Sequence, residues 1–282
     1  MAAYQIRDAR PEDLPAQREI LRLCFGDSPE EADLYLRDAE GFGARSLVAE
    51  QDRRVISTIT LLPGLTLHSA TGERYACPYT YALGTLPEAR GQGIGMALLL
   101  AMADSARAEA GFVCGAVFEK KLRDIYPRYV PMETMGRIRE AAFDREELPA
   151  VPPPALTELS PEAYGRAREA FLRGRAHAEY APGYLRLAAR FGARFWQGPG
   201  LLAVTEPGEE RCPVRELLTE PGGYDRAAAA LAAAFPARHY RFRTPPSLRP
   251  EKLPREGEIL DTFVSLGPPP SGEDFWAPLT LE

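Results

Sequence analysis

The sequence predicts an α/β fold of the α+β kind: a mixed, largely antiparallel twisted sheet with helices on both faces, followed by a second, smaller α/β domain. Three observations support this prediction. Short apolar strands alternate with amphipathic helices before residue 118. A glycine-rich turn at 90–95 joins a strand to a helix. A proline-rich stretch at 146–154 interrupts the chain near its middle, and consecutive prolines cannot continue a helix.

Local patterns predict each element of the N-terminal part. Pro11 and the carboxylates that follow it suit the first turn of a helix, whose dipole end is positive, and Gly26 ends that helix. Ser28 with Glu31 predicts a capping box for a second helix. Apolar and β-branched runs bounded by turn residues predict strands. The predicted strands are 4–7, 46–50, 55–62, 65–68, 74–86 and 112–118, and the predicted helices are 11–25, one from 29 onward, and 94–110.

The proline-rich stretch predicts the division into domains. Residues 1–145 form the first predicted domain, 146–154 a stiff extended linker, and 155–282 the second domain. Phe275 and Trp276 are expected to dock the end of the chain. Within the second domain we expect helices at 161–174 and 224–235 and strands at 201–204, 213–218, 239–243 and 258–266.

Composition excludes several classes of protein. With 34 basic and 40 acidic side chains the net charge is −6, which argues against a dedicated nucleic-acid binder. The longest apolar run, 94–103, is far shorter than the roughly 20 residues of a membrane span, and the polar start predicts no secretory signal. Four cysteines without a C-x-x-C pair and three histidines without ligand spacing predict reduced cytoplasmic thiols and no metal site. These residues are Cys24, Cys77, Cys114, Cys212, His68, His177 and His239.

The turn between Leu86 and the helix at 94–110 has the clearest chemical pattern. It reads R-G-Q-G-I-G over residues 90–95. Amides at a helix N-terminus are unpaired and carry partial positive charge, and glycines remove the side chains that would keep a phosphate away. The pattern therefore predicts a pyrophosphate-binding loop. It has no lysine of the nucleoside-triphosphatase type, and Met96 stands where the dinucleotide fingerprint requires its third glycine.

This segment resembles the acetyl-coenzyme A signature of the GNAT superfamily of N-acetyltransferases, and the resemblance covers about residues 4–140. It implies that the loop holds the pyrophosphate of acetyl-CoA, through Arg90, Gly91, Gln92, Gly93, Ile94, Gly95 and Met96. It also implies that the main chain of Leu83 and Thr85 pairs with the pantetheine arm and polarises the thioester carbonyl. Gly84 between them is interpreted as a bulge that opens the sheet.

The same resemblance suggests catalytic residues. Tyr126 falls where the family usually places a tyrosine that protonates the departing thiolate, a role open to a phenol with a pKa of about 10; the alternative is a half-buried tyrosine that caps the core. Glu119 is a candidate base for the acceptor amine; the alternative is a carboxylate that is solvated or paired with Lys120 or Arg123. Tyr79 and Tyr81 either line the acceptor pocket or pack in the sheet.

A GNAT unit joined to a second unit without the coenzyme motif resembles the enhanced-intracellular-survival type of acetyltransferase, which carries two GNAT folds in tandem. The resemblance implies an acetyl-CoA-dependent N-acetyltransferase, without a metal, in which a primary amine attacks the thioester directly in a ternary complex. The acceptor is a small-molecule amine or a protein amine. A homo-oligomer is compatible with the sequence. Because residues around Tyr126 differ from the family pattern, a non-catalytic acyl-CoA-binding, sensing or interaction protein on the same fold remains an alternative.

Overall fold

The computed structural model describes residues 4–116 and 120–279 and contains two compact units. The first comprises residues 4–67, 73–135 and 263–272, and the second comprises 68–72, 136–262 and 273–279. The predicted linker at 146–154 therefore lies inside the second unit. The chain crosses between Met135 and Gly136, inside a strand, because that strand pairs with the second unit over its later residues.

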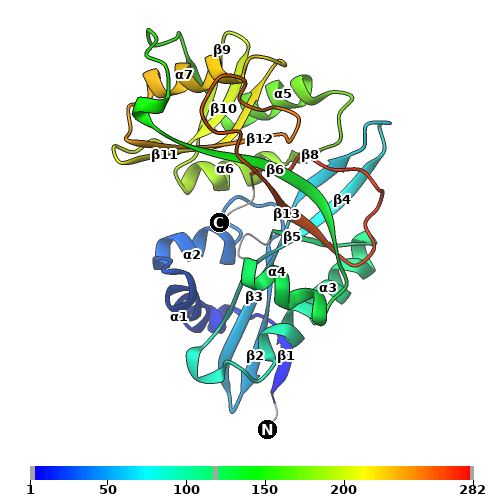
Figure 1. The fold of residues 1–282 in the computed structure, drawn as a ribbon. Helices are drawn as coiled ribbons and strands as arrows, with labels where there is room; N and C mark the ends of the chain where they lie inside the picture. The colour runs from blue at the N-terminus through cyan, green and yellow to red at the C-terminus, as the bar shows by residue number, and fades with distance from the viewer. Residues whose placement is uncertain (1–3, 117–119, 280–282) are drawn as a thin grey trace. The chain divides into compact units, whose positions relative to one another are not determined.

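The first unit is built in the predicted order of strands and helices (Figure 1). One difference is that Pro63 and Gly64, which are typical of a turn, lie within one continuous strand. Its elements are β1 (Gln5–Asp8), α1 (Leu14–Phe25), α2 (Pro29–Leu36), β2 (Arg45–Gln51), β3 (Arg54–His68), β4 (Arg74–Thr85), α3 (Ile94–Ala110), β5 (Cys114–Ala116) and α4 (Lys120–Ile125).

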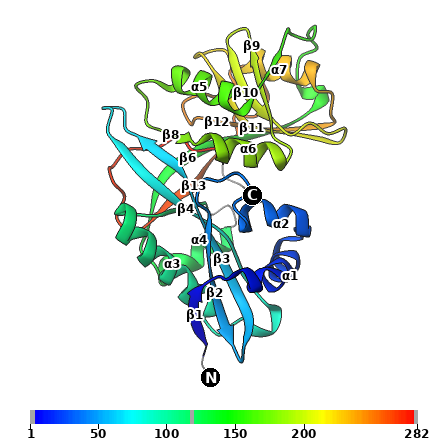
Figure 2. The same cartoon turned by 180° about the vertical axis from the view of Figure 1, so that it is seen from behind.

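Helices cover both faces of the first unit's sheet, as predicted. Helices α1 and α2 lie on one side of β2, β3 and β4, and α3 lies on the other (Figures 1 and 2). Successive strand residues point to opposite faces, so Val48 packs with Ile20 of α1, while Leu47 packs with Met102 of α3. The fold class of a mixed, largely antiparallel sheet between helices is confirmed.

The second unit has these elements: β7 (Thr157–Leu159), α5 (Pro161–Leu172), β8 (His177–Tyr180), α6 (Pro182–Arg190), β9 (Arg194–Gly198), β10 (Leu201–Thr205), β11 (Arg211–Thr219), α7 (Tyr224–Ala234) and β12 (His239–Thr244). The hairpin of β10 and β11 and the alanine-rich α7 agree with the sequence prediction. Helix α6 and strands β8 and β9 were missed. Phe275 and Trp276 are buried, which confirms that they dock the end of the chain.

Each unit takes the sixth strand of its sheet from a distant part of the chain. Two strands, β6 (Met132–Asp144) and β13 (Glu258–Leu266), contribute residues to both units. In the first unit the parallel pair β4–β5 is followed by antiparallel β13, and in the second the parallel pair β11–β12 is followed by antiparallel β6. Because Val264 and Leu266 of β13 belong to the core under α3, cutting the chain at the predicted linker would remove part of the first unit.

Two cysteines that are far apart in the sequence meet in the first unit. The Sγ atoms of Cys77 on β4 and Cys114 on β5 lie 2.8 Å apart, and both residues are free, buried thiols. Burial raises the pKa of the Cys114 thiol well above its ordinary value of 9.0, which makes it a poor nucleophile.

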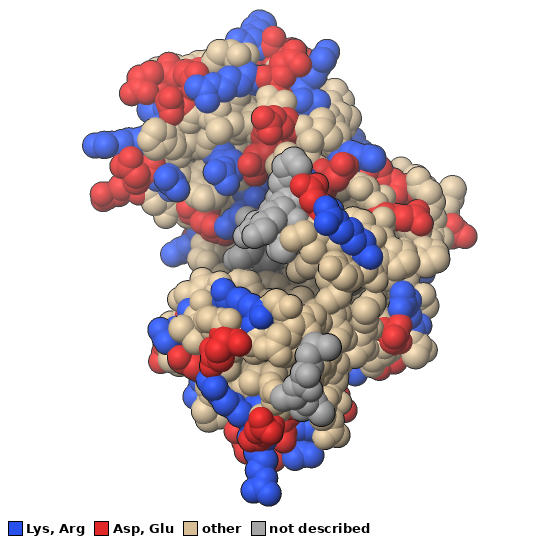
Figure 3. All heavy atoms as spheres, turned by 60° about the horizontal axis from the view of Figure 1, so that its bottom comes forward, with Lys and Arg blue, Asp and Glu red and all other residues tan. Residues whose placement is uncertain are grey.

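On the face drawn in Figure 3, basic and acidic side chains are interspersed and form no continuous basic stripe. No helix in the described part of the chain is long and apolar enough to cross a bilayer.

A buried carboxylate holds the second unit together. Glu216 of β11 is fully buried and accepts hydrogen bonds from Tyr164 Oη at 2.5 Å, Arg168 Nε at 2.9 Å and Trp276 Nε1 at 2.5 Å. Burial, together with the nearby Glu216 carboxylate, raises the pKa of Tyr164 well above its ordinary value of 10.0, so its hydroxyl remains a donor. Arg168 Nη1 in turn donates to the Ala178 carbonyl at 2.5 Å. The cluster thus joins α5, β8, β11 and the end of the chain.

We predict that Glu216→Gln lowers the free energy of unfolding by about 3–5 kcal/mol, because it removes the fully buried counter-charge of Arg168 and leaves only the longer pair with the partly exposed Glu169. Urea denaturation followed by circular dichroism measures the loss. Glu206→Gln is the matched control, since Glu206 pairs with Arg215 where both side chains are partly exposed, and it should lose about 1 kcal/mol or less. Equal losses in the two variants would contradict the role given to Glu216.

Candidate active site

The glycine loop (residues 90–96) leaves the first amides of α3 uncovered. Gly91 and Gly93 adopt left-handed φ angles of 76° and 78°, and Gly93 is the N-cap of α3. A Cβ atom added to either glycine would meet nothing within 4 Å, and residues 90–93 are exposed. In the described part of the chain no side chain caps this helix. The loop therefore presents free backbone donors and the positive end of a helix dipole, which suit a phosphate group.

The rest of the loop is anchored in the cores of the first unit. Ile94 is buried in the core under α1, and Met96 packs against the core under α3. A Cβ at Gly95 would lie 3.1 Å from Thr85 Oγ1, so a glycine allows α3 to begin close to the end of β4. Gln92 is exposed on the loop. The predicted coenzyme-binding loop is therefore exposed at residues 90–93 and packed into the cores of the first unit at Ile94 and Met96.

The described pairing of β4 with β5 is short, and residues 117–119, which follow β5, lie outside the described part of the chain. The parallel ladder pairs Tyr79 with Cys114 and Thr80 with Gly115, and in the described residues it extends no further toward Thr85. The backbone irregularity lies at Ala82, which has a φ of 53°. The interpretation of Gly84 as a bulge stays a prediction.

Gly84 also leaves room for a neighbouring helix. A Cβ there would lie 2.8 Å from Ile20 Cγ2 and 3.2 Å from Cys24 Sγ, so glycine allows α1 to approach β4.

Hydrogen bonds hold the end of β4 in place. Ser57 Oγ donates to the Gly84 carbonyl at 2.7 Å and lies 2.8 Å from Thr85 Oγ1. Arg90 Nε donates to the Thr85 carbonyl at 3.1 Å, so the exposed guanidinium folds back beside the glycine loop. Leu83 packs against the core under α3. The two predicted pantetheine-pairing residues are therefore positioned rigidly.

The structure brings Tyr126 to the same core. It begins a 3-10 turn after α4, is half-buried, and packs with Leu83 and Met96 against the core under α3. Its carbonyl accepts the amides of Tyr129 and Val130 at 2.9 and 3.0 Å, which fixes its backbone. Glu119, the candidate base, lies outside the described residues.

A tyrosine cluster beside β4 includes a carboxylate that sequence reasoning missed. The Tyr35 and Tyr81 rings meet edge to face at 5.0 Å, and Tyr79 lies 6.2 Å from Tyr81. Tyr35 Oη donates to Asp27 Oδ2 at 2.6 Å. Burial raises the pKa of Asp27 above its ordinary value of 3.8, although the hydrogen bond from Tyr35 opposes the shift. The sequence signal that could have drawn attention to Asp27 is its position between Gly26, which ends α1, and Ser28, which caps α2.

The corresponding turn of the second unit, between β11 and α7, has different chemistry. It contains Gly222 and Gly223, but the first turn of α7 carries Asp225. The Asp225 carboxylate accepts the amides of Glu251 and Lys252 at 3.1 and 2.8 Å. An anionic side chain already occupies this helix start, which does not suit a pyrophosphate.

We predict that Gly93→Ala lowers the free energy of unfolding by about 1–2 kcal/mol, because an L-residue is strained at this φ although its methyl group meets no atom. Chemical denaturation measures the change. Gly272→Ala is the control: its Cβ also enters open space but its φ is outside the left-handed region, so its stability should change little. A similar loss in both variants would argue against backbone strain at Gly93.

Comparison with known proteins supports the resemblance drawn from the loop. Residues 5–129 match the model of a family described as acetyltransferase (GNAT) domain. This match contains the glycine loop and Tyr126, and it confirms the predicted resemblance to the GNAT superfamily for the N-terminal part. No curated protein sequence matches the chain.

Several solved structures share the fold over nearly the whole chain. A probable N-acyltransferase from Enterococcus faecalis superimposes with a TM-score of 0.68 at 14% identity, over 94% of this chain and 72% of that one. Eis1 from Mycobacterium abscessus gives 0.63 at 15% identity, over 94% and 73%. A tandem GNAT protein from the clavulanic acid biosynthesis pathway gives 0.61 at 13% identity, over 95% and 100%. The chain therefore has the fold of a tandem GNAT protein.

Proposed function

We propose that the chain is an acetyl-CoA-dependent N-acetyltransferase, an acyltransferase that transfers the acetyl group to a primary amine. The observation that carries the proposal is the glycine loop: uncovered amides at the start of α3, at the position of the coenzyme signature within the matched family segment. These amides and the Arg90 guanidinium suit the pyrophosphate of the coenzyme. The main chain of Leu83 and Thr85 at the end of β4 is proposed to pair with the amide-rich pantetheine arm.

The proposed reaction is direct transfer in a ternary complex. The neutral amine attacks the thioester carbon, and backbone donors near Leu83 and Thr85 stabilise the oxygen that becomes negative. The C–S bond then breaks, and Tyr126 donates a proton to the departing sulfur. Holding the two substrates side by side contributes to the rate because it removes the entropic cost of their encounter.

The tyrosine cluster at β4 supports a place for the acceptor. Tyr81 is a partly exposed aromatic ring that packs on the buried Tyr35, and the partly exposed Asp27 adds a carboxylate whose raised pKa makes it a stronger base than an exposed aspartate. An amine arriving as a cation would be attracted to this group and could lose its proton there. Glu119 remains the second candidate for the base.

Calorimetry with acetyl-CoA, followed by thiol release with a panel of small amines and amine-bearing peptides, tests the function. We expect one coenzyme site per chain and release of free thiol only when an acceptor is present. Arg90→Glu should weaken acetyl-CoA binding at least tenfold, because it places a carboxylate beside the phosphate-binding amides. Arg211→Glu makes the same charge change at an exposed position of β11 and should have no such effect.

Absence of coenzyme binding in the folded wild-type chain would contradict the proposal. Binding without thiol release for any acceptor would instead support the alternative of a non-catalytic sensor on the same fold.

We predict that Tyr126→Phe lowers kcat by about 10²–10⁴-fold and leaves the Kd for acetyl-CoA unchanged, because the variant keeps the packing ring and loses the proton donor. Steady-state kinetics and calorimetry measure the two quantities. Tyr129→Phe, at a side chain that is 61% exposed, is the control and should retain full activity. If Tyr126→Phe retained the wild-type kcat, Tyr126 would be a packing residue only.

A further inference from the structure

A pocket in the second unit contains a cluster of histidines and carboxylates that the proposed reaction does not use. The pocket has a volume of about 690 Å³. Its walls come from the turn at 68–72, helix α5, strand β8 and the start of α6. Five of its lining side chains are of types that can bind a metal ion: His68, Glu162, Glu169, His177 and Glu179.

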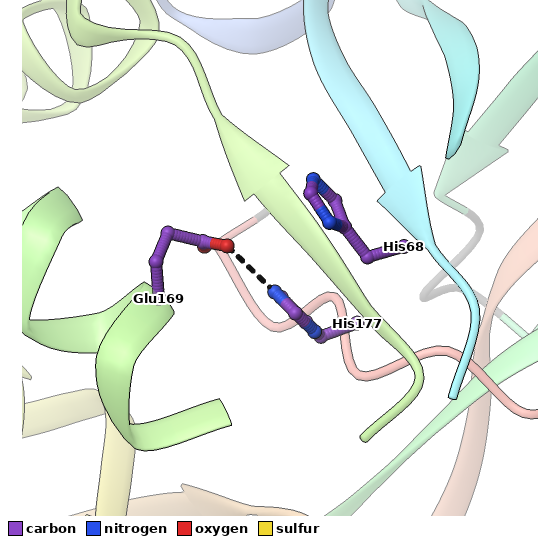
Figure 4. Close-up of side chains that lie close together, drawn as sticks. All are labelled: His68, Glu169 and His177. Carbon is purple, nitrogen blue, oxygen red and sulfur yellow. Dashed lines mark hydrogen bonds and ion pairs between the residues drawn. The ribbon is translucent and has the colours of Figure 1, made fainter. Parts of the chain in front are cut away.

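Three of these side chains lie close together (Figure 4). His68, Glu169 and His177 each offer a ligand atom, and these atoms all lie within 4.8 Å of one another. The two imidazole rings are stacked with their centroids 5.0 Å apart, and the Glu169 carboxylate points toward His177. The sequence prediction of no metal site relied on the wide spacing of the histidines. The tertiary structure brings His68 and His177 together despite that spacing.

The two ring nitrogens of His177 face different acceptors. His177 Nδ1 lies 2.8 Å from the Arg175 carbonyl, which can only accept, so Nδ1 carries a proton. His177 Nε2 lies 2.8 Å from Glu169 Oε2, which is also an acceptor. A neutral ring would point its lone pair at the carboxylate. A metal ion at Nε2 would be bound by the imidazole and would face the carboxylate of Glu169.

The surroundings resemble the outer shell of a metal site. Metal-binding histidines commonly donate their other N–H to a backbone carbonyl or a carboxylate. His177 does so to Arg175, and His68 Nε2 lies 2.6 Å from Glu179 Oε2. Burial would raise the pKa of Glu169, but the hydrogen bond from His177 and the charge of Arg168 hold it below its ordinary value.

The Glu216 cluster holds these side chains in position. Arg168, the neighbour of Glu169 on α5, donates to the carbonyl of Ala178, the neighbour of His177 on β8. Strand β8 is also held by hydrogen bonds that join Ala176 and Ala178 to the backbone of Trp276. Ligands that are held before the ion arrives lose little entropy on binding.

We propose that His68, Glu169 and His177 bind one divalent transition-metal ion of the zinc class. Two imidazoles and one carboxylate are a donor set that Zn²⁺ prefers, and three protein ligands leave a position open. That position faces the pocket, where water or a small anion can complete the coordination. Arg166, Arg173 and Arg175 line the same pocket and suit an anionic ligand.

The test is Zn²⁺ binding to the full chain after treatment with EDTA, measured by competition with a chromogenic chelator. We expect one equivalent of bound Zn²⁺. His68→Gln and Glu169→Gln should each weaken binding at least tenfold, because each removes one ligand. The matched control is His239→Gln: His239 is an exposed histidine paired with Asp144 and Glu210, so its loss should not change Zn²⁺ affinity.

Two results would overturn the proposal: less than one equivalent bound by the wild-type chain, or equal affinity in all three variants. The cluster would then be two His–Glu ion pairs. Co²⁺ titration of the wild-type chain gives an answer that does not depend on folded variants. Intense visible absorption of a four-coordinate nitrogen–oxygen site supports the proposal, whereas the spectrum of hydrated Co²⁺ contradicts it.

Discussion

The second unit depends on one buried interaction, the bonding of the Glu216 carboxylate. A charged group in the protein interior is tolerated only when its hydrogen-bonding capacity is met and a counter-charge is present. Tyr164, Arg168 and Trp276 meet both needs, and they come from α5 and from the end of the chain. The cluster also sets the positions of Glu169 and His177, because their neighbours Arg168 and Ala178 are joined by a hydrogen bond. The proposed metal site therefore depends on an ion pair that takes no part in binding.

In the first unit the candidate site depends on backbone geometry at glycines, whereas the second unit depends on the buried charge of Glu216. Left-handed glycines at 91 and 93 expose the first amides of α3, and Gly95 and Gly84 allow α3 and α1 to approach β4. The two units share one strand arrangement, in which a parallel pair is followed by an antiparallel strand. That antiparallel strand is β13 in the first unit and β6 in the second. Neither unit is therefore a continuous piece of chain.

Local patterns predicted much of the fold and of the coenzyme site. The capping box at Ser28, the end of α1 at Gly26 and the glycine loop depend on residues close in sequence, so their chemistry is visible without the fold. The long strand β6 was missed because half of it pairs with a partner about a hundred residues away. Gly84 was interpreted as a bulge because glycine is typical of bulges, and the structure adds that this glycine lets α1 approach β4 and that the nearby Ala82 has a positive φ.

The sequence by itself determined the α/β class, the glycine loop and its suitability for a pyrophosphate, because each follows from the order of neighbouring residues. Only the tertiary structure decided which strands β6 and β13 pair with. It also decided that Asp27 bonds to Tyr35 beside Tyr81, and that His68 stacks on His177. The physical reason is that these contacts join segments far apart along the chain. Such segments meet only when hydrophobic packing has closed the loops between them.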